Sequence, residues 1–163
     1  MDSVTTDVTY YAAFSKTTKA YTVTFDANTG SGTMTAQTFT PGVAQNLFAN
    51  AFTAPTGYHF AGWNTQADGN GTAYNDKENI TISENITLYA QWEINEYTIT
   101  FVDEDGIELQ SGKVAHGTVP TAPADPSKKA DVQYTYDFAG WNPTVVEATG
   151  DATYTATYTA THN

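Results

Sequence analysis

Short runs of alternating hydrophobic and polar residues follow one another along the chain, separated by turn residues. Residues 21–26 alternate with period two, as a half-buried strand does. After a Gly-containing turn at 28–32, residues 34–40 predict the return arm of a hairpin. The apolar positions of residues 45–52 are instead spaced for one or two helical turns, and residues 58–64 predict another strand. This stretch therefore predicts two strands, a short helix and a third strand.

The first predicted unit then ends, and a second unit with the same pattern begins. Residues 80–82 predict a short strand and residues 86–92 a closing strand, after which residues 97–101 repeat the pattern of residues 21–25. The second unit follows the same plan, with a strand at 97–101, a turn at 103–106, a return arm at 108–114, a helical turn at 127–131, and strands at 132–141 and 152–159.

One five-residue sequence, Phe-Ala-Gly-Trp-Asn, occurs at residues 60–64 and again at residues 138–142. An aromatic, a small residue, a glycine and Trp predict a buried strand, in which the glycine permits close approach of another group or marks a bulge. We interpret the repeated aromatic and glycine positions as a structural signature and not as a binding site. Its residues are Phe60, Gly62, Trp63, Trp92, Phe138, Gly140, Trp141 and Tyr158.

Residues 7–14 repeat the sequence pattern of residues 151–158 without a gap. They are expected to be the closing strand of a preceding unit, so that the chain belongs to a longer array. An unpaired strand is expected to pair with the edge of the first module or with another copy. The predicted domains are a strand remnant with linker (1–19), a first repeat module (20–94) and a second repeat module (95–163).

The predicted fold class is α+β and β-dominated. The order hairpin, short helix and further strands suits tandem small β-grasp (ubiquitin-like) modules in an elongated arrangement, with the last strand of each parallel to its first. Units of this size bury a limited apolar surface, so aromatic packing is expected to stabilise them. Abundant Thr and Tyr agree with strands.

Charge and composition exclude several classes of function. The net charge is −12, from 18 acidic residues and 6 Lys, and the chain has no Arg and no Cys. Nucleic acid is a poor partner for such a chain, and disulfides and thiolate metal sites are impossible. No apolar run is long enough for a membrane helix. No cofactor, catalytic residue or metal site is predicted.

The candidate metal ligands are scattered along the sequence. His59, His116 and His162 do not share metal-ligand spacing. The loop that begins at Asp68 starts like a calcium loop but has Ala73 at its sixth position, so an ordinary turn is expected. The acidic residues 103–105 offer a loose cation site, although Asp-Gly between alternating strands is also a common hairpin turn.

Two other possibilities concern individual side chains. Lys19 and Lys113 are the candidate donors for a Lys–Asn crosslink of the kind found in some surface stalks. Tyr10, Tyr11 and Tyr74 could stack on sugar rings if they are exposed, although core packing is the favoured interpretation. No Ser or Thr lies in a recognisable nucleophile motif, so the chain is not expected to be an enzyme.

Residues 57–63 (Gly-Tyr-His-Phe-Ala-Gly-Trp) and 87–92 (Thr-Leu-Tyr-Ala-Gln-Trp) make the first unit resemble the Listeria–Bacteroides repeat. Residues 136–141 (Tyr-Asp-Phe-Ala-Gly-Trp) and 152–158 (Ala-Thr-Tyr-Thr-Ala-Thr-Tyr) make the second unit similar to the internalin-type B-repeat. The second unit departs from this resemblance in its Pro-rich middle, residues 120–126. The resemblance implies β-grasp-like modules of secreted or wall-anchored bacterial proteins.

Such modules serve as spacers or contribute to adhesion. The expected function is a non-catalytic stalk that presents an adhesive domain outside the cell, with neighbouring repeats as partners. The alternative is that the modules themselves bind a host surface protein or a glycan. Clustered exposed aromatic residues would favour the alternative, and scattered ones would favour the stalk.

Overall fold

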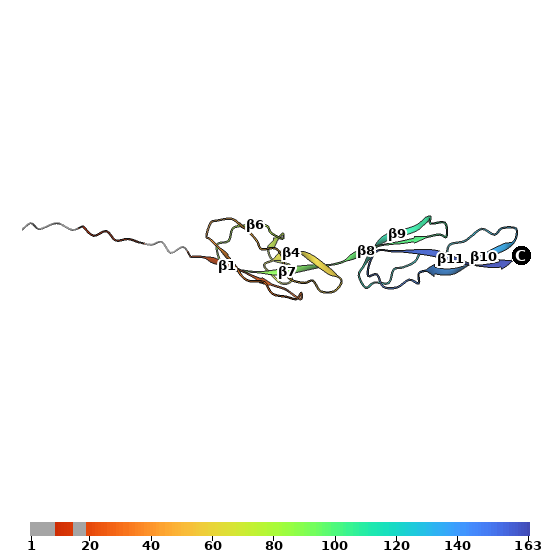
Figure 1. Ribbon diagram of the computed structural model, residues 1–163, viewed down its shortest axis with the longest axis horizontal. Coiled ribbons are helices and arrows are strands. Elements are labelled where there is room, and N and C mark those ends of the chain that lie inside the picture. Colours follow the sequence, from red (N-terminus) through yellow and green to blue (C-terminus); the bar gives the residue numbers. More distant parts are fainter. Residues whose placement is uncertain (1–8, 15–18) are drawn as a thin grey trace, which may run out of the picture.

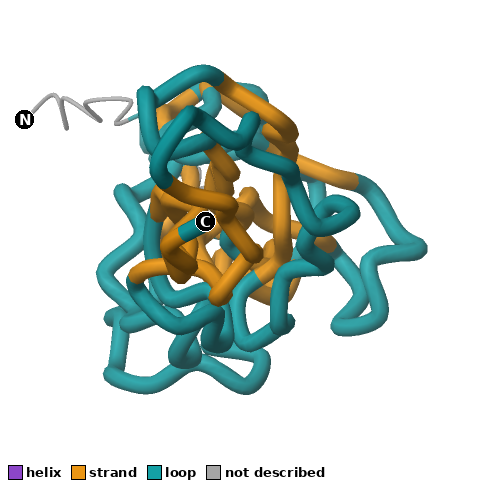
Figure 2. The backbone as a smooth tube through the Cα atoms, turned by 90° about the vertical axis from the view of Figure 1, so that its right-hand side faces the viewer, coloured by secondary structure: helices purple, strands orange, loops and turns teal. Residues whose placement is uncertain are grey.

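The computed structural model describes residues 9–14 and 19–163 of the chain. Within these residues the chain forms an elongated series of strands and loops without any helix (Figure 1; Figure 2). The strands are β1 (Tyr21–Asp26), β2 (Gln37–Phe39), β3 (Gln45–Asn46), β4 (Tyr58–Asn64), β5 (Ala73–Tyr74), β6 (Asn79–Ile80), β7 (Ile86–Ile94), β8 (Glu96–Val102), β9 (Glu108–Ala115), β10 (Tyr134–Asn142) and β11 (Ala152–His162). The fold class is therefore all-β, and the predicted α+β class with short helices is wrong.

Each module is built on one main sheet. In the predicted first module (residues 20–94) the sheet has the order β2-β1-β7-β4-β5, and in the predicted second module (residues 95–163) it has the order β10-β11-β8-β9. A two-stranded sheet of β3 and β6 adds to the first module. In each main sheet the last long strand lies parallel to the first, β7 beside β1 and β11 beside β8, as the sequence predicted. The chain consequently enters a module at one end and leaves it at the other.

The helix expected at residues 45–52 does not form, because several backbone groups of this segment bond to other parts of the module and not to the next turn of a helix. Gln37 is buried, and its side-chain amide donates to Asn46 O at 2.8 Å and accepts from Phe48 N–H at 2.8 Å. Leu47 N–H donates to Glu78 O at 2.9 Å. These bonds hold the segment extended, and the apolar spacing that suggested a helix serves only to bury Leu47 and Phe52.

The helical turn expected at residues 127–131 is also absent. The prolines at 120, 123 and 126 cannot donate backbone hydrogen bonds, which disfavours a helix in the residues that precede this segment. At its end the Asp131 carboxylate accepts from the N–H groups of Gln133 and Tyr134, at 2.7 and 2.8 Å. An aspartate that bonds to the backbone two or three residues further on favours a turn over a helix, and β10 begins directly after it.

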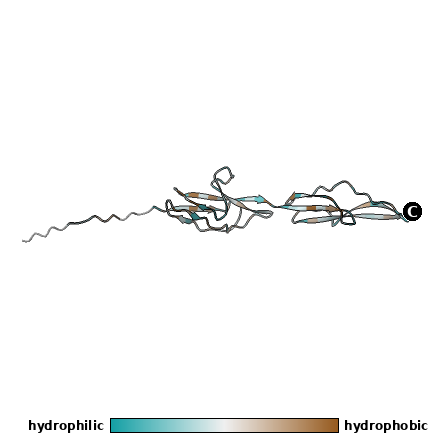
Figure 3. Ribbon diagram, turned by 90° about the horizontal axis from the view of Figure 1, so that it is seen from above, coloured by the Kyte–Doolittle hydropathy of each residue, from teal (hydrophilic) through white to brown (hydrophobic). Residues whose placement is uncertain are grey.

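The hydrophobic positions lie along the strands of both modules (Figure 3). The core of the first module contains the buried side chains Val23, Phe25, Phe39, Leu47, Phe52, Trp63, Ile80, Ile82, Leu88 and Ala90. The core of the second module contains Ile99, Phe101, Ala148 and Tyr154. Alternate residues of the central strands face these cores, which is the period-two pattern that predicted them.

Residues 9–14, the described part of the strand predicted at 7–14, pair with no strand in the described structure. Residues 7 and 8 lie outside the described residues. A closing strand lies beside the first strand of its sheet, and β7 and β11 already fill that position in the two modules. The side chains of Tyr10, Tyr11 and Phe14 are consequently 90%, 89% and 93% exposed.

Candidate functional site at the junction of the two modules

The signature residues of the first module lie in its core. Trp63 is 1% exposed and packs against Phe25 and Phe60, each with ring centroids 4.9 Å away. Its indole nitrogen is buried without a hydrogen-bond partner in the described structure. Trp92 instead donates its indole N–H to the carbonyls of Ala27 and Asn28, at 2.9 and 3.0 Å. Both side chains therefore hold the module together and present no reactive group.

The second module uses its signature residues in the same way, with less burial. Trp141 packs against Phe101 at 4.8 Å and Phe138 at 5.3 Å, and Phe138 lies edge-on to Tyr158 at 6.1 Å. Gly140 and its counterpart Gly62 follow a β-bulge in β10 and β4, with φ of +123° and +138°. These conformations require glycine.

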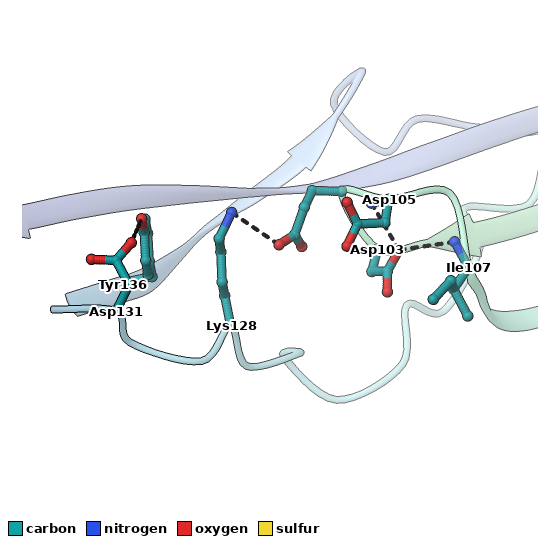
Figure 4. Close-up of polar contacts among 7 residues, drawn as sticks. Asp103, Asp105, Ile107, Lys128, Asp131 and Tyr136 are labelled. Carbon is teal, nitrogen blue, oxygen red and sulfur yellow. Dashed lines mark hydrogen bonds and ion pairs between the residues drawn. The ribbon is translucent and has the colours of Figure 1, made fainter. Parts of the chain in front are cut away.

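The acidic turn at residues 103–105 is stabilised by its own side chains (Figure 4). The Asp103 carboxylate accepts from the N–H groups of Asp105 and Ile107, at 2.9 and 2.8 Å. Glu104 forms an ion pair with Lys128, with Nζ and Oε1 3.1 Å apart. A lysine therefore neutralises part of the acidic turn, which joins the antiparallel strands β8 and β9.

Lys128 lies at the centre of a small polar cluster. Its ammonium is 4.6 Å from the centroid of the Tyr136 ring, and its pKa is raised chiefly by the bond to Glu104. The Tyr136 hydroxyl donates to Asp131 Oδ2 at 2.7 Å, which lowers the pKa of Asp131 and raises the pKa of Tyr136 (Figure 4). Burial raises the pKa of Tyr158. These groups tie the loop at 127–131 to the sheet.

The loop after Asp68 is an ordinary turn. Asp68 accepts from the backbone and the side chain of Asn70, at 3.0 and 2.9 Å, and these bonds lower its pKa. The side-chain oxygen Oδ1 of Asn64 accepts from the N–H groups of Gln66 and Gly71, at 2.9 Å each. The side-chain amides of Asn64 and Asn70 thus bond to the backbone and the carboxylate of this loop.

Other candidate groups are dispersed. Among residues 9–14 and 19–163, no group of three or more His, Asp or Glu side chains could hold a metal ion. His162 lies edge-on to Tyr134 at the end of β11, with ring centroids 5.3 Å apart. Lys113 donates to Thr98 Oγ1 at 2.9 Å, and Lys19 lies 5.5 Å from the Tyr21 ring centroid. Tyr74 packs partly buried against the first core.

A polar arrangement between distant segments surrounds Asn95, the one residue between β7 and β8. Its N–H donates to Gly57 O at 2.8 Å, and its carbonyl accepts from His116 N–H at 2.8 Å. Gly57 precedes β4, and His116 follows β9. Asn95 therefore continues the β4–β7 pairing directly into the β8–β9 pairing.

Side chains from both modules close around this residue. His59 Nδ1 lies 2.8 Å from Asn95 Oδ1, and the Tyr97 hydroxyl lies 3.3 Å from His116 Nδ1. The His116 ring packs on Gly57, where any Cβ would collide with it. Two of the three histidines thus belong to the junction. The sequence did not indicate this, because both lie far from Asn95 along the chain.

The family model of the Listeria-Bacteroides repeat domain matches residues 21–91 and 97–163. The chain therefore belongs to this family of bacterial repeat domains, with two repeats. It is 39% identical over 126 residues to Internalin H of Listeria monocytogenes, which covers 76% of this chain and 20% of that protein. It is 31% identical over 146 residues to a protein of Evansella cellulosilytica described as a membrane protein, which covers 86% of this chain and 19% of that one.

The chain thus spans a fifth or less of the length of these two relatives. Among solved structures, domains 3-4 of the streptococcal high identity repeats in tandem from a cell surface protein share 16% identity, with a TM-score of 0.29, over 88% of this chain and 99% of that one. Within the described residues there is no helix with the length and apolarity needed to cross a membrane.

Proposed function

We propose that the two modules form a rigid spacer, a stalk that carries another part of a bacterial surface protein away from the cell. The observation that carries this proposal is the junction at Asn95. A linker of one residue, bonded through its N–H to Gly57 and through its carbonyl to His116, leaves few backbone torsions free to bend.

The path of the chain supports the same function. Each module has parallel first and last strands, so its entry and exit lie at opposite ends and further repeats lengthen the rod. The extended run of β7, Asn95 and β8 crosses the junction without a turn (Figure 1). A strand of that length spans on the order of 50 Å. Relatives much longer than this chain fit a role as one segment of a stalk.

The exposed aromatic residues also favour a spacer. Outside residues 9–14, the exposed aromatic side chains in the described structure are Phe48 and Tyr58, 45% and 41% exposed. They lie on different segments of the first module, and the second module adds none. An adhesive surface for sugars or proteins is usually a contiguous patch.

The rigidity can be measured directly because the chain has no cysteine. Thr38→Cys and Ala139→Cys introduce spin labels at exposed sites in β2 and β10. We expect a single narrow distance distribution. A matched variant with glycines inserted after Asn95 should give a broad one. A broad distribution in the chain without the insertion would contradict the proposal.

A further inference from the structure

The second main sheet has an open edge where the first sheet has an additional strand. In the first module β5 pairs antiparallel with β4, with Trp63 opposite Tyr74 and Asn64 opposite Ala73. In the second module β10 contains the same five residues, Phe-Ala-Gly-Trp-Asn, and the same bulge, and it pairs with β11 alone. In the described structure no backbone hydrogen bond reaches the outer side of residues 138–142.

The glycine that makes room for β5 has a counterpart at this edge. A Cβ placed on Gly62 would lie 2.9 Å from Tyr74 O, so the glycine in β4 accommodates the carbonyl of the added strand. A Cβ placed on Gly140 would have nothing within 4 Å. Both glycines have similar positive φ values, so the backbone is similar up to Trp63 in β4 and Trp141 in β10. The two edges differ two residues further on, where Thr65 N–H donates to Thr72 O, directly before the added strand, and Pro143 has no N–H to donate.

We infer that the outer edge of β10 at residues 138–142 binds an extended, cationic segment of another protein, in the antiparallel register that β5 has on β4. Backbone hydrogen bonds to an open strand supply affinity in such strand addition, and flanking side chains supply specificity. This inference goes beyond the spacer function, since a rod needs no lateral partner.

Charge selects the partner. Residues 95–163 contain ten acidic side chains and three lysines, and within the described structure only Glu104 of these acids forms an ion pair. Asp137 lies exposed on β10 itself. A second copy of the chain carries a net charge of −12 and is repelled, whereas a segment containing Lys or Arg is attracted.

The probe is a synthetic peptide with the sequence of residues 71–75, the β5 segment, flanked by lysines. It is titrated into the isotope-labelled chain while backbone amide shifts and amide hydrogen exchange are followed. We expect saturable shifts and slowed exchange at residues 140–142. Residues 62–64, which β5 already covers, should not respond and serve as the control within the same molecule.

Two peptide controls and one variant test the mode of binding. A peptide N-methylated at its central residues lacks the required donors and should not bind. A peptide flanked by glutamates should bind more weakly. Asp137→Asn, at an exposed position, should weaken the lysine peptide about two-fold.

Three outcomes would overturn the inference. They are an absence of saturable shifts at millimolar peptide, shifts centred on β9, and shifts in β10 that the N-methylated peptide also produces. None of these outcomes affects the distance measurement across the junction, so failure here is distinguishable from failure of the spacer proposal.

Discussion

The two modules share a signature and a strand order but differ in how completely they cover their cores. Within the described residues the first core is a cluster of ten buried hydrophobic side chains and the second a cluster of four, with Val102 and Ala156 buried beside it. The sheet of β3 and β6 and the strand β5 occur only in the first module. In the second module a groove of about 370 Å³ opens between β9 and residues 118–121, over Ile99 and Phe101. Modules with corresponding long strands can therefore differ in how completely their cores are covered.

The register of the sheets explains this difference. Gln37 lies opposite Val23 in the first module, and Gly112 lies opposite Ile99 in the second. Phe39 likewise corresponds to Val114, because each is paired with the first tyrosine of its central strand. The first module fills this region with an amide and an aromatic ring, and the second leaves it open with a glycine and a smaller side chain.

The largest expected effect sharpens the comparison of the cores. Trp63→Ala should destabilise the first module by about 3–5 kcal/mol, because it removes a fully buried ring that three aromatic side chains contact. Trp141→Ala, at a half-buried ring, should cost less, about 2 kcal/mol. Urea unfolding monitored at amides of each module measures both values. Equal losses would show that the two cores are equally closed.

The signature glycines provide the next test. Gly140→Ala should cost about 1–3 kcal/mol, because alanine is strained at a φ of +123°. Gly62→Ala should cost more, since its Cβ would also press on Tyr74 O and displace β5. Thermal unfolding of both variants gives the difference. If the two substitutions destabilise the chain equally, the close approach of β5 to Gly62 adds nothing to the destabilisation by Gly62→Ala.

A smaller effect concerns the side chains that hold the covering loops. Gln37→Ala should cost about 1–3 kcal/mol, because it leaves Asn46 O and Phe48 N–H without partners in a part-buried region. The matched variant is Gln110→Ala in the second module, where an exposed Gln110 donates to Thr121 O at 2.9 Å. This loss should be at most about 1 kcal/mol. Urea unfolding measures both, and a larger loss for Gln110 would reverse the comparison.

The long strands and their pairing could be predicted from the sequence much better than the segments that cover the sheets. Period-two runs and the repeated aromatic-glycine sequence indicated the long strands, and the positions of β1, β4, β8 and β11 agree closely with them. The prediction of a helix at residues 45–52 was wrong because it rested on the spacing of apolar residues alone. That spacing cannot reveal that the distant Gln37 side chain bonds to the backbone of this segment. Tertiary hydrogen bonds outweighed a weak local preference.

The junction could not be predicted for a related reason. The sequence indicated a link of several residues between the closing strand and residue 97, whereas β7 and β8 extend toward each other until only Asn95 remains. Its partners Gly57 and His116 carry no local pattern that relates them. The boundaries 1–19, 20–94 and 95–163 remain predictions, which limited proteolysis of the chain would test.

The smallest expected effect compares two carboxylates, one in each module. The pKa of Asp131 is lowered chiefly by the Tyr136 hydroxyl and then by two backbone N–H groups, whereas the pKa of Asp68 is lowered by Asn70. Tyr136→Phe should therefore raise the pKa of Asp131 toward its ordinary value and leave that of Asp68 unchanged. A carbon-detected NMR titration of the aspartate carboxyls measures both pKa values in one sample.

The same substitution has a defined consequence for stability against pH. A carboxyl whose pKa is lower in the folded state stabilises the fold above the unfolded pKa of about 3.9, and this contribution disappears as the pH falls through the folded pKa. Tyr136→Phe narrows the gap between the two pKa values for Asp131. As the pH falls, the free energy of unfolding of the second module should therefore decrease less in the variant than in the parent chain. The decrease for the first module should be the same in both. A pKa of Asp131 that does not change in the variant would mean that the Gln133 and Tyr134 N–H groups alone hold this carboxylate at the start of β10.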